Sequence, residues 1–159
     1  MPLSLIAAVS SNGCIGKDGG IPWNIPDEQL LFKELTLHKT VLMGRKTWES
    51  IPEQFRPLRD RLNVVITRQA DYPLPPEVER FNDLSSAFSA HASEDICVIG
   101  GAEIYRATID LADTLYLSHI DQIVEGDTFF PTIDPAQWQC VEQKAYPGFL
   151  FVTYQRNKK

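Results

Sequence analysis

The sequence contains few of the residues that bind metals or form disulfides. It has three cysteines and three histidines in 159 residues. The cysteines are odd in number, and neither residue type shows the paired short spacing of a zinc site or of a redox C-x-x-C motif. We therefore expect reduced thiols, as in a cytoplasmic protein, and no metal. The residues in question are Cys14, Cys97, Cys140, His38, His91 and His119.

A surplus of cations and a long apolar run are also missing. Lys and Arg total 15 against 21 Asp and Glu, which gives a net charge of −6. This sign disfavours broad contact with the phosphates of a nucleic acid. No run approaches the roughly 18 apolar residues of a membrane span. The apolar residues 3–9 lack the preceding cation of a secretory leader, so we interpret them as a strand.

Composition and pattern predict one α/β domain over residues 1–159. Apolar residues make up 43% of the chain, and we find no repeat or linker. Apolar strand-like runs alternate with helical patterns early, and strands follow strands late. This order predicts a central, mostly parallel sheet with antiparallel C-terminal strands, flanked by about four helices. The expected strands are 3–9, 40–43, 62–67, 96–99, 114–118, 139–142 and 149–154, and the expected helices are 27–38, 45–51, 84–91 and 102–109.

One segment has a local excess of positive charge. Residues 44–68 contain six cations and three acids, although the chain as a whole is acidic. Such a segment would attract an anionic small ligand, because a cleft focuses local rather than net charge. A charged, solvated loop explains the same composition. The cations are Arg45, Lys46, Arg56, Arg59, Arg61 and Arg68.

Two strand-to-helix junctions share a pattern. TVLM at residues 40–43 leads into Gly44, and ICVI at residues 96–99 leads into Gly100 and Gly101. Glycine allows a sharp turn and the close approach of a ligand, and the N–H groups of a helix start favour phosphate. Ligands of open α/β sheets bind outside the carboxyl ends of the strands. The pair of junctions predicts a phosphate site, although each alone is also compatible with an ordinary turn.

The segment IPWNIPDEQLLF at residues 21–32 has the composition of a helix start. Its prolines and the acids Asp27 and Glu28 complement the helix dipole, which is one explanation for both acids. Periodicity separates them, because Glu28 lies four and seven residues before Phe32 and Leu35 and therefore shares their apolar face. Burial there would raise the pKa of Glu28, which makes it a candidate for an active site.

The ordered motifs of the chain resemble those of the dihydrofolate reductase family almost from end to end. The resemblance implies NADPH as cofactor, 7,8-dihydrofolate as substrate and antifolate inhibitors as further ligands. It implies hydride transfer to C6 of the pterin and protonation at N5. We expect a monomer. The matching motifs are SLIAAV at 4–9, IG at 15–16, IPWNIP at 21–26, MGRKTWESI at 43–51, VIGGAEIY at 98–105 and VEGDTFFP at 124–131.

The resemblance assigns the substrate site to residues on several segments. Glu28 takes the position of the family's carboxylate, which would hydrogen-bond the pterin N3 and 2-amino groups and favour protonation at N5. Trp23 would hold an ordered water near the pterin. Arg61 would pair with the α-carboxylate of the glutamyl tail. The other substrate-binding residues implied are Ile6, Ala7, Phe32, Ile51, Leu58 and Ser118.

The resemblance also assigns the cofactor site. Arg45 and Arg68 would face the 2′-phosphate of NADPH, Lys46 and Thr47 the pyrophosphate, and Tyr105 the nicotinamide. Residues 10–21 match a mobile loop that closes over the nicotinamide. The remaining cofactor positions implied are Ala8, Ile15, Gly16, Gly44, Thr67, Ile99, Gly100, Gly101, Ala102 and Asp127, the last of which would contact the loop.

Three residues depart from the family pattern. Many bacterial members have aspartate at the position of Glu28 and an apolar residue at that of Gln29, and Ser118 replaces a usual threonine. EQLLFK followed by GRKT resembles the trimethoprim-insensitive reductases, so we hypothesise insensitivity. Two alternatives stay open: the reductase of riboflavin synthesis, which acts on a ribosylaminopyrimidine, and a non-catalytic NADPH-binding module.

Overall fold

The computed structural model describes residues 2–16 and 25–157. Within this part of the chain, one large sheet contains eight strands, a separate pair contains two, and four α-helices and a 3-10 helix complete the fold. The strands of the large sheet are Leu3–Ser10 (β1), Thr40–Gly44 (β3), Leu62–Ile66 (β4), Glu79–Phe81 (β5), Ile96–Gly100 (β6), Thr114–Ile120 (β7), Trp138–Tyr146 (β9) and Phe149–Arg156 (β10). The separate pair is Cys14–Gly16 (β2) and Thr128–Phe129 (β8). The helices are Pro26–Thr36 (α1), Arg45–Ser50 (α2), Glu53–Phe55 (η1, 3-10), Leu84–Ala90 (α3) and Ala102–Thr108 (α4).

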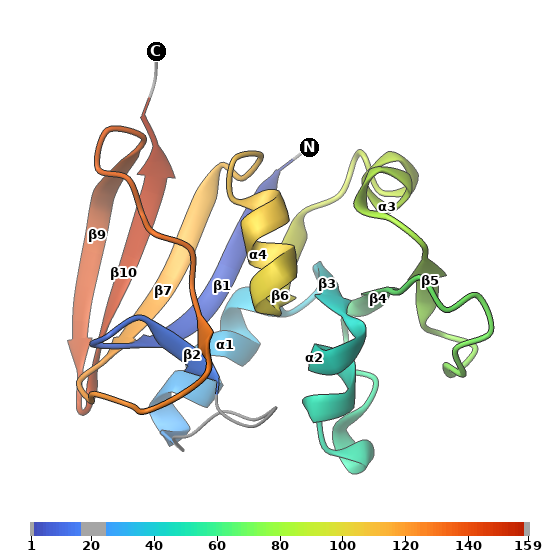
Figure 1. Ribbon diagram of the computed structural model, residues 1–159, viewed down its shortest axis with the longest axis horizontal. Helices are drawn as coiled ribbons and strands as arrows, with labels where there is room; N and C mark the ends of the chain where they lie inside the picture. The colour runs from blue at the N-terminus through green and yellow to red at the C-terminus, as the bar shows by residue number, and fades with distance from the viewer. Residues whose placement is uncertain (1, 17–24, 158–159) are drawn as a thin grey trace.

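The strand order across the large sheet is β5-β4-β3-β6-β1-β7-β10-β9 (Figure 1). Every neighbouring pair from β5 to β7 is parallel, whereas β7–β10 and β10–β9 are antiparallel. The antiparallel pair β9–β10 is joined by only two residues, Pro147 and Gly148, while parallel neighbours need longer crossovers. The predicted fold class, a mostly parallel sheet with antiparallel C-terminal strands, is confirmed.

The central strands bury side chains on both faces of the sheet. Leu5 packs in a cluster with Tyr105 of α4, while its neighbour Ile6 packs in a second cluster with Trp48 of α2. This alternation follows from the two-residue period of a strand. Helices α3 and α4 therefore cover one face, and α1 and α2 cover the other. Further members are Ala87 of α3 in the first cluster and Phe32 of α1 beside the second.

Most predicted elements are confirmed, with boundaries shifted by a few residues. The expected helix 27–38 ends earlier, at Thr36, whose hydroxyl donates to the Phe32 carbonyl at 2.8 Å. His38 has a φ of +63°, which a continuing α-helix does not allow. The expected strand 139–142 extends at both ends to Trp138–Tyr146 because it pairs with β10, although most of its side chains are exposed.

The sequence patterns missed β2, β5 and β8. Each has two or three residues, too few to show a hydrophobic period. The strands β2 and β8 pair with each other, and β5 pairs with β4 at the edge of the large sheet. Of the helices in the described part of the chain, none has the length and apolar character needed to cross a bilayer.

Candidate active site

The neighbouring strands β1 and β6 separate towards their carboxyl ends. Their pairing runs from Leu3↔Ile96 to Leu5↔Val98, whereas the pairing of β1 with β7 continues to Ser10↔Ile120. Beyond Leu5, therefore, β1 follows β7 and leaves β6. In open α/β sheets, ligands bind where strands diverge at their carboxyl ends. We call this place the β1–β6 opening.

Glu28 lies in the first turn of α1, on the side that faces the sheet. Leu35, two turns further along, packs against the cluster of Ile6 and Trp48, as does Phe32. Glu28 is partly buried, while the preceding acid, Asp27, is exposed. Burial raises the pKa of Glu28 to about 7. The predicted difference between the two acids is confirmed, because Glu28 is partly buried and Asp27 is exposed.

Tyr105 reaches the β1–β6 opening from the opposite face of the sheet. It is 4% exposed, and its hydroxyl donates to the Ile6 carbonyl at 2.6 Å. Burial, and then the negative charge of Glu28, raise the pKa of Tyr105 above its ordinary value. The phenol is therefore a neutral donor. Ile6 links the two helices at this opening, because Tyr105 of α4 bonds its carbonyl and Phe32 of α1, one turn after Glu28, packs against the cluster of its side chain.

The two glycine junctions meet at the same edge of the sheet. β3 ends at Gly44 and β6 at Gly100, and Met43 is the register partner of Gly100. Gly100 has a φ of +136°, and a Cβ on it would lie 2.9 Å from Thr47 Oγ1 and 3.6 Å from the Tyr105 hydroxyl. A side chain at this position would collide with Thr47, so glycine lets the end of β6 lie close against the start of α2. We call this junction the glycine cradle.

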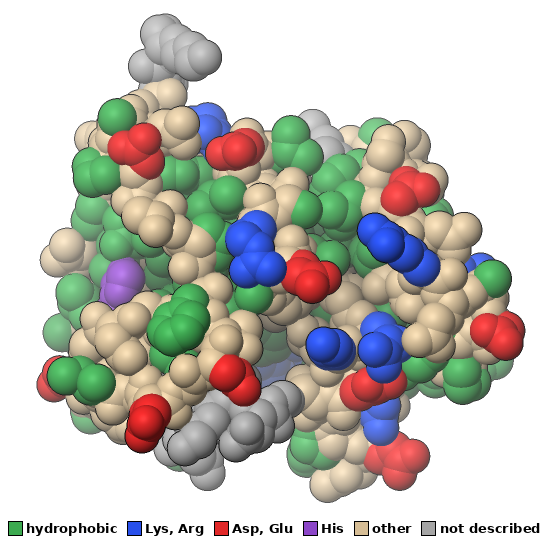
Figure 2. Space-filling view, viewed as in Figure 1, with side chains coloured by type: hydrophobic (Ala, Val, Ile, Leu, Met, Phe, Trp, Pro, Cys, Tyr) green, Lys and Arg blue, Asp and Glu red, His purple; other side chains and the backbone are tan. Residues whose placement is uncertain are grey.

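Several cations surround the glycine cradle. Arg45 and Lys46 begin α2 directly after Gly44, and Gly44 is the register partner of Ile66 at the end of β4. Thr67 and Arg68 follow β4 and therefore lie at the same edge. Figure 2 shows Lys and Arg side chains beside a hollow in this half of the molecule. Because α2 and α4 are short, we expect the side-chain cations, rather than the helix dipoles, to supply most of the attraction for an anion.

The charged segment 44–68 is nevertheless divided between the two ends of the sheet. Arg61 precedes β4 and so lies at the amino ends of the strands, where its Nη1 donates to Thr36 Oγ1 at 2.9 Å. Arg56 lies over the Trp48 ring, 5.4 Å from its centroid. Thr36 is eight residues after Glu28 on α1, a span of about 12 Å along the helix. An extended ligand could therefore contact Glu28 and Arg61 at its two ends.

The expected lining residues fall on different faces of the sheet. Four of them belong to or pack against the cluster that holds Trp48, on the face covered by α1 and α2: Ile6, Phe32, Ile51 and Leu58. Ala7 packs in the opposite cluster, the one that contains Tyr105. Ser118 is buried on β7 and is the register partner of Ala8.

The strand pair β2–β8 brings two expected loop segments together. Gly16 is the register partner of Thr128, and Ile15 packs against the cluster that contains Tyr105. Asp127 accepts a hydrogen bond from the Thr128 hydroxyl at 2.9 Å. The first loop and the segment of Asp127 therefore meet at Gly16 and Thr128, while a contact between Asp127 itself and the loop stays a prediction. Trp23 and residues 17–22 of the expected loop and motif lie outside the described residues.

Glu49 and Tyr72, which hold the expected residue Arg45 beside the cradle, were not predicted as site residues. Arg45 Nη1 donates to both carboxylate oxygens of Glu49 at 3.0 Å, and the Tyr72 hydroxyl donates to Glu49 Oε2 at 2.7 Å. The four-residue spacing of Arg45 and Glu49 on a helix was a detectable signal. Tyr72 gave none, because it lies in a proline-rich connection whose path depends on tertiary contacts.

The fold and the site define a class: α/β proteins with a glycine-rich, cationic edge of the sheet next to a partly buried acid. The family model described as dihydrofolate reductase matches residues 2–156. The chain belongs to the dihydrofolate reductase family.

Individual relatives agree with this assignment. A dihydrofolate reductase of Neisseria meningitidis is 44% identical over 144 residues, which cover 90% of this chain and 87% of that protein. Dihydrofolate reductase type A13 of Escherichia coli is 39% identical, covering 94% and 90%. The solved structure of Enterococcus faecalis dihydrofolate reductase complexed with NADP(H) and RAB-propyl has a TM-score of 0.88 at 32% identity, covering 99% of this chain and 97% of that one.

Proposed function

We propose that this chain reduces 7,8-dihydrofolate to 5,6,7,8-tetrahydrofolate with NADPH, and that Glu28 binds the pterin and supports its protonation. NADPH, when bound, supplies the hydride that is transferred to C6, and a proton from water completes the reaction at N5. The observation that carries the proposal is the partly buried carboxyl of Glu28, whose pKa is raised to about 7, at the opening that Tyr105 and the glycine cradle also face.

Glu28 is suited to two tasks at the pterin. Its ionised form accepts hydrogen bonds from N3–H and the 2-amino group, a donor pair that matches the two oxygens of a carboxylate. Because its pKa lies near neutrality, the group also exchanges readily between its ionised and protonated forms at physiological pH. Glu28 would therefore anchor the ring and favour the N5-protonated state from which C6 accepts hydride.

The other residues of the opening position the reactants and exclude water. Tyr105 holds the Ile6 carbonyl at the edge of the opening and stays protonated because its pKa is raised. Apolar side chains on the α1 face shield the pterin, so the reacting atoms meet in a medium of low polarity. Arg61 would bind the α-carboxylate of the glutamyl tail at the far end of α1. The apolar residues are Ile6, Phe32, Ile51 and Leu58.

The glycine cradle fits a dinucleotide. Gly100 and Gly101 lie close against Thr47 at the start of α2, so the backbone N–H groups of this junction would be near a bound pyrophosphate. Lys46 and Thr47 would hold that pyrophosphate, while Arg45 and Arg68 would bind the 2′-phosphate. The remaining expected cofactor contacts are Ala8, Ile15, Gly16, Gly44, Thr67, Ile99, Ala102, Tyr105 and Asp127.

A pair of matched variants tests the role of Glu28. We expect Glu28→Gln to lower turnover at least about 100-fold at neutral pH, because the amide cannot ionise, while NADPH still binds. The loss of NADPH absorbance on addition of dihydrofolate measures turnover, and quenching of protein fluorescence measures NADPH binding. Asp27→Asn is the control, because it removes an exposed carboxylate one residue away. Equal activity in both variants, or a wild-type chain that binds NADPH without turnover, would contradict the proposal.

The same site suggests insensitivity to trimethoprim. Glu28 reaches one methylene further than aspartate, and the polar Gln29 follows it on α1, so we infer a pocket that fits a diaminopyrimidine poorly. We expect Glu28→Asp combined with Gln29→Leu to tighten inhibition about 10-fold or more, the equivalent of one hydrogen bond. Tight inhibition of the wild type that stays unchanged in the double variant would remove the basis of this proposal.

We also infer that the enzyme is a cytoplasmic monomer that does not bind nucleic acid. Its net charge of −6 supports the last point. The sedimentation coefficient, measured over a range of protein concentrations, tests the monomeric state. A monomer gives one value throughout, and an increase with concentration would contradict this inference.

A further inference from the structure

Arg45 is held by a chain of three polar side chains at the edge of the glycine cradle. Arg45 Nη1 lies 3.0 Å from each carboxylate oxygen of Glu49, and the Tyr72 hydroxyl lies 2.7 Å from Glu49 Oε2. Arg45 and Glu49 are separated by one turn of α2, while Tyr72 comes from the connection between β4 and β5. The chain therefore ties the helix that follows β3 to the segment that follows β4.

An exposed ion pair alone would not fix Arg45. The side chains of Arg45 and Glu49 are 32% and 43% exposed, and ordering two long side chains at such sites offsets most of their attraction. Tyr72 changes this balance because it is itself anchored: its ring packs against the cluster of Val65 and Trp48. A rigid hydroxyl that donates to Glu49 restrains the carboxylate, and the carboxylate restrains the guanidinium.

The charges around this chain favour an ionised Glu49. The Tyr72 hydroxyl contributes most to lowering the pKa of Glu49, and Arg45 and Arg56 add to the effect. Burial and the Glu49 carboxylate raise the pKa of Tyr72, so the phenol remains a donor. The contacts with Glu49 use Nη1 of Arg45, and the guanidinium has further donors on Nη2 and Nε with which it can bind a second anion.

We propose that Glu49 and Tyr72 are positioning residues that hold Arg45 ready for the 2′-phosphate of NADPH and thereby set the preference for NADPH over NADH. This inference rests on the proposed function, which assigns Arg45 to that phosphate. In this proposal neither residue itself binds the phosphate. Their contribution is to order Arg45 before binding, so that less conformational freedom is lost when the phosphate arrives.

Tyr72→Phe tests the proposal without changing any charge. We expect the ratio of kcat/KM for NADPH to kcat/KM for NADH to fall about 3-fold to 10-fold, the effect of losing one hydrogen bond, through a higher KM for NADPH. Tyr154→Phe is the matched control, because its hydroxyl bonds His119 on the opposite side of the sheet. An unchanged ratio overturns the proposal, and so does a raised ratio, which would show that Glu49 competes with the phosphate for Arg45.

Further variants separate this inference from the proposed function. Glu49→Gln should lower the ratio at least as much as Tyr72→Phe, and combining the two should add nothing, because Tyr72 acts through Glu49. In an Arg45→Met background, Tyr72→Phe should have no effect on the ratio, and an equal fall there would overturn the inference. If Arg45→Met alone leaves the ratio unchanged, the assignment of Arg45 to the 2′-phosphate is wrong. Denaturant unfolding of each variant distinguishes lost positioning from lost folding.

Discussion

The two ends of the parallel strands use their charged side chains in opposite ways. At the carboxyl ends, β3 and β6 stop on glycine, and Lys46 and Arg68 are exposed beside the cradle, while Arg45 pairs with Glu49. At the amino ends, the charged groups bind one another. His91 is 6% exposed, with Nδ1 2.7 Å from Glu94 Oε2 and Nε2 3.0 Å from Glu79 Oε1, and the Thr40 hydroxyl donates to the same Glu94 oxygen.

The same difference is found in the walls of a hollow at the amino ends. The amino ends border a hollow of about 530 Å³, lined by His38, Lys39, Thr40, Asp60, Arg61, Leu62, Glu94 and Asp95. Cations and acids mix along its wall, so much of the field cancels locally. At the carboxyl ends the cations adjoin bare backbone instead, and an incoming anion can use both.

The comparison predicts its largest effect at the glycine cradle. Gly100→Ala places a Cβ 2.9 Å from Thr47 Oγ1 on a backbone with φ of +136°. We expect a loss of about 3 kcal/mol in stability, with NADPH affinity lowered as well. Gly148→Ala is the control, because its φ is also positive, +88°, but the new Cβ would have only an ordinary contact with Ile25. Thermal unfolding and NADPH titration of both variants measure the difference. Equal losses would mean that backbone strain, and not the cradle, determines the result.

A smaller effect of opposite sign is expected at Glu28. Its folded-state pKa of about 7 exceeds the ordinary value of 4.5, so the unfolded chain ionises first and stability falls as pH rises between these values. We therefore expect Glu28→Gln to be more stable than wild type by about 2 kcal/mol above pH 7 and to differ little below pH 4.5. Urea unfolding across this range measures it. A gain that does not depend on pH would contradict the assignment of the raised pKa to Glu28.

The smallest effect is expected at the amino ends. Burial opposes the charged form of His91, but the hydrogen bonds of Glu79 and Glu94 outweigh it and raise the pKa of His91. This network should stabilise the fold below pH 6.5, the ordinary value, and lose its contribution as pH rises through the raised one. We expect His91→Gln to cost about 1 kcal/mol in urea unfolding below pH 6.5, and less at higher pH, with kcat unchanged.

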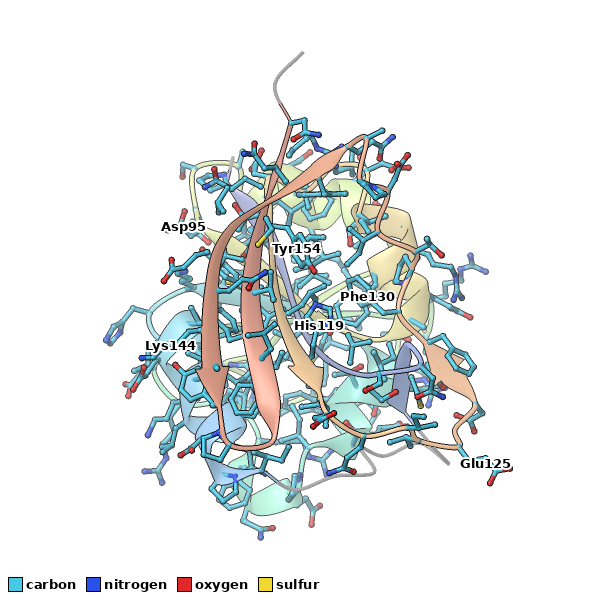
Figure 3. The ribbon with its side chains drawn as sticks, turned by 90° about the vertical axis from the view of Figure 1, so that its left-hand side faces the viewer. Asp95, His119, Glu125, Phe130, Lys144 and Tyr154 are labelled. Carbon is cyan, nitrogen blue, oxygen red and sulfur yellow. The ribbon has the colours of Figure 1, made fainter. Side chains whose placement is uncertain are left out.

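His119 provides the contrasting control for this measurement. It lies beside Tyr154 on β7 and β10, 3.0 Å from its hydroxyl (Figure 3). Burial lowers the pKa of His119, so its charging in the unfolded chain destabilises the fold as pH falls below 6.5. His119→Gln should therefore reduce the loss of stability at low pH, whereas His91→Gln should increase it. The same pH dependence in both variants would show that neither environment has been assigned correctly.

Local patterns predicted much of this architecture. The apolar face of α1, and with it the difference between Glu28 and Asp27, follows from a period of 3.6 residues within a dozen positions. The glycine junctions were also evident, because each consists of an apolar run, a glycine and a helix start in immediate succession. The short strand β5 and the two ends of β9 were not predicted, since these segments are held by hydrogen bonds to a neighbouring strand and show no hydrophobic period.

The sequence by itself determined the fold class, the acid on the apolar face and the two glycine turns, because these depend on residues that are close in the chain. The tertiary structure alone decided that β6 lies between β3 and β1, which unites the turns and brings Tyr105 to Ile6. It also separated Arg61 from Arg45 and placed Tyr72 against Glu49. These contacts join residues far apart in sequence, and their partners are selected by the packing of the whole sheet rather than by any local period.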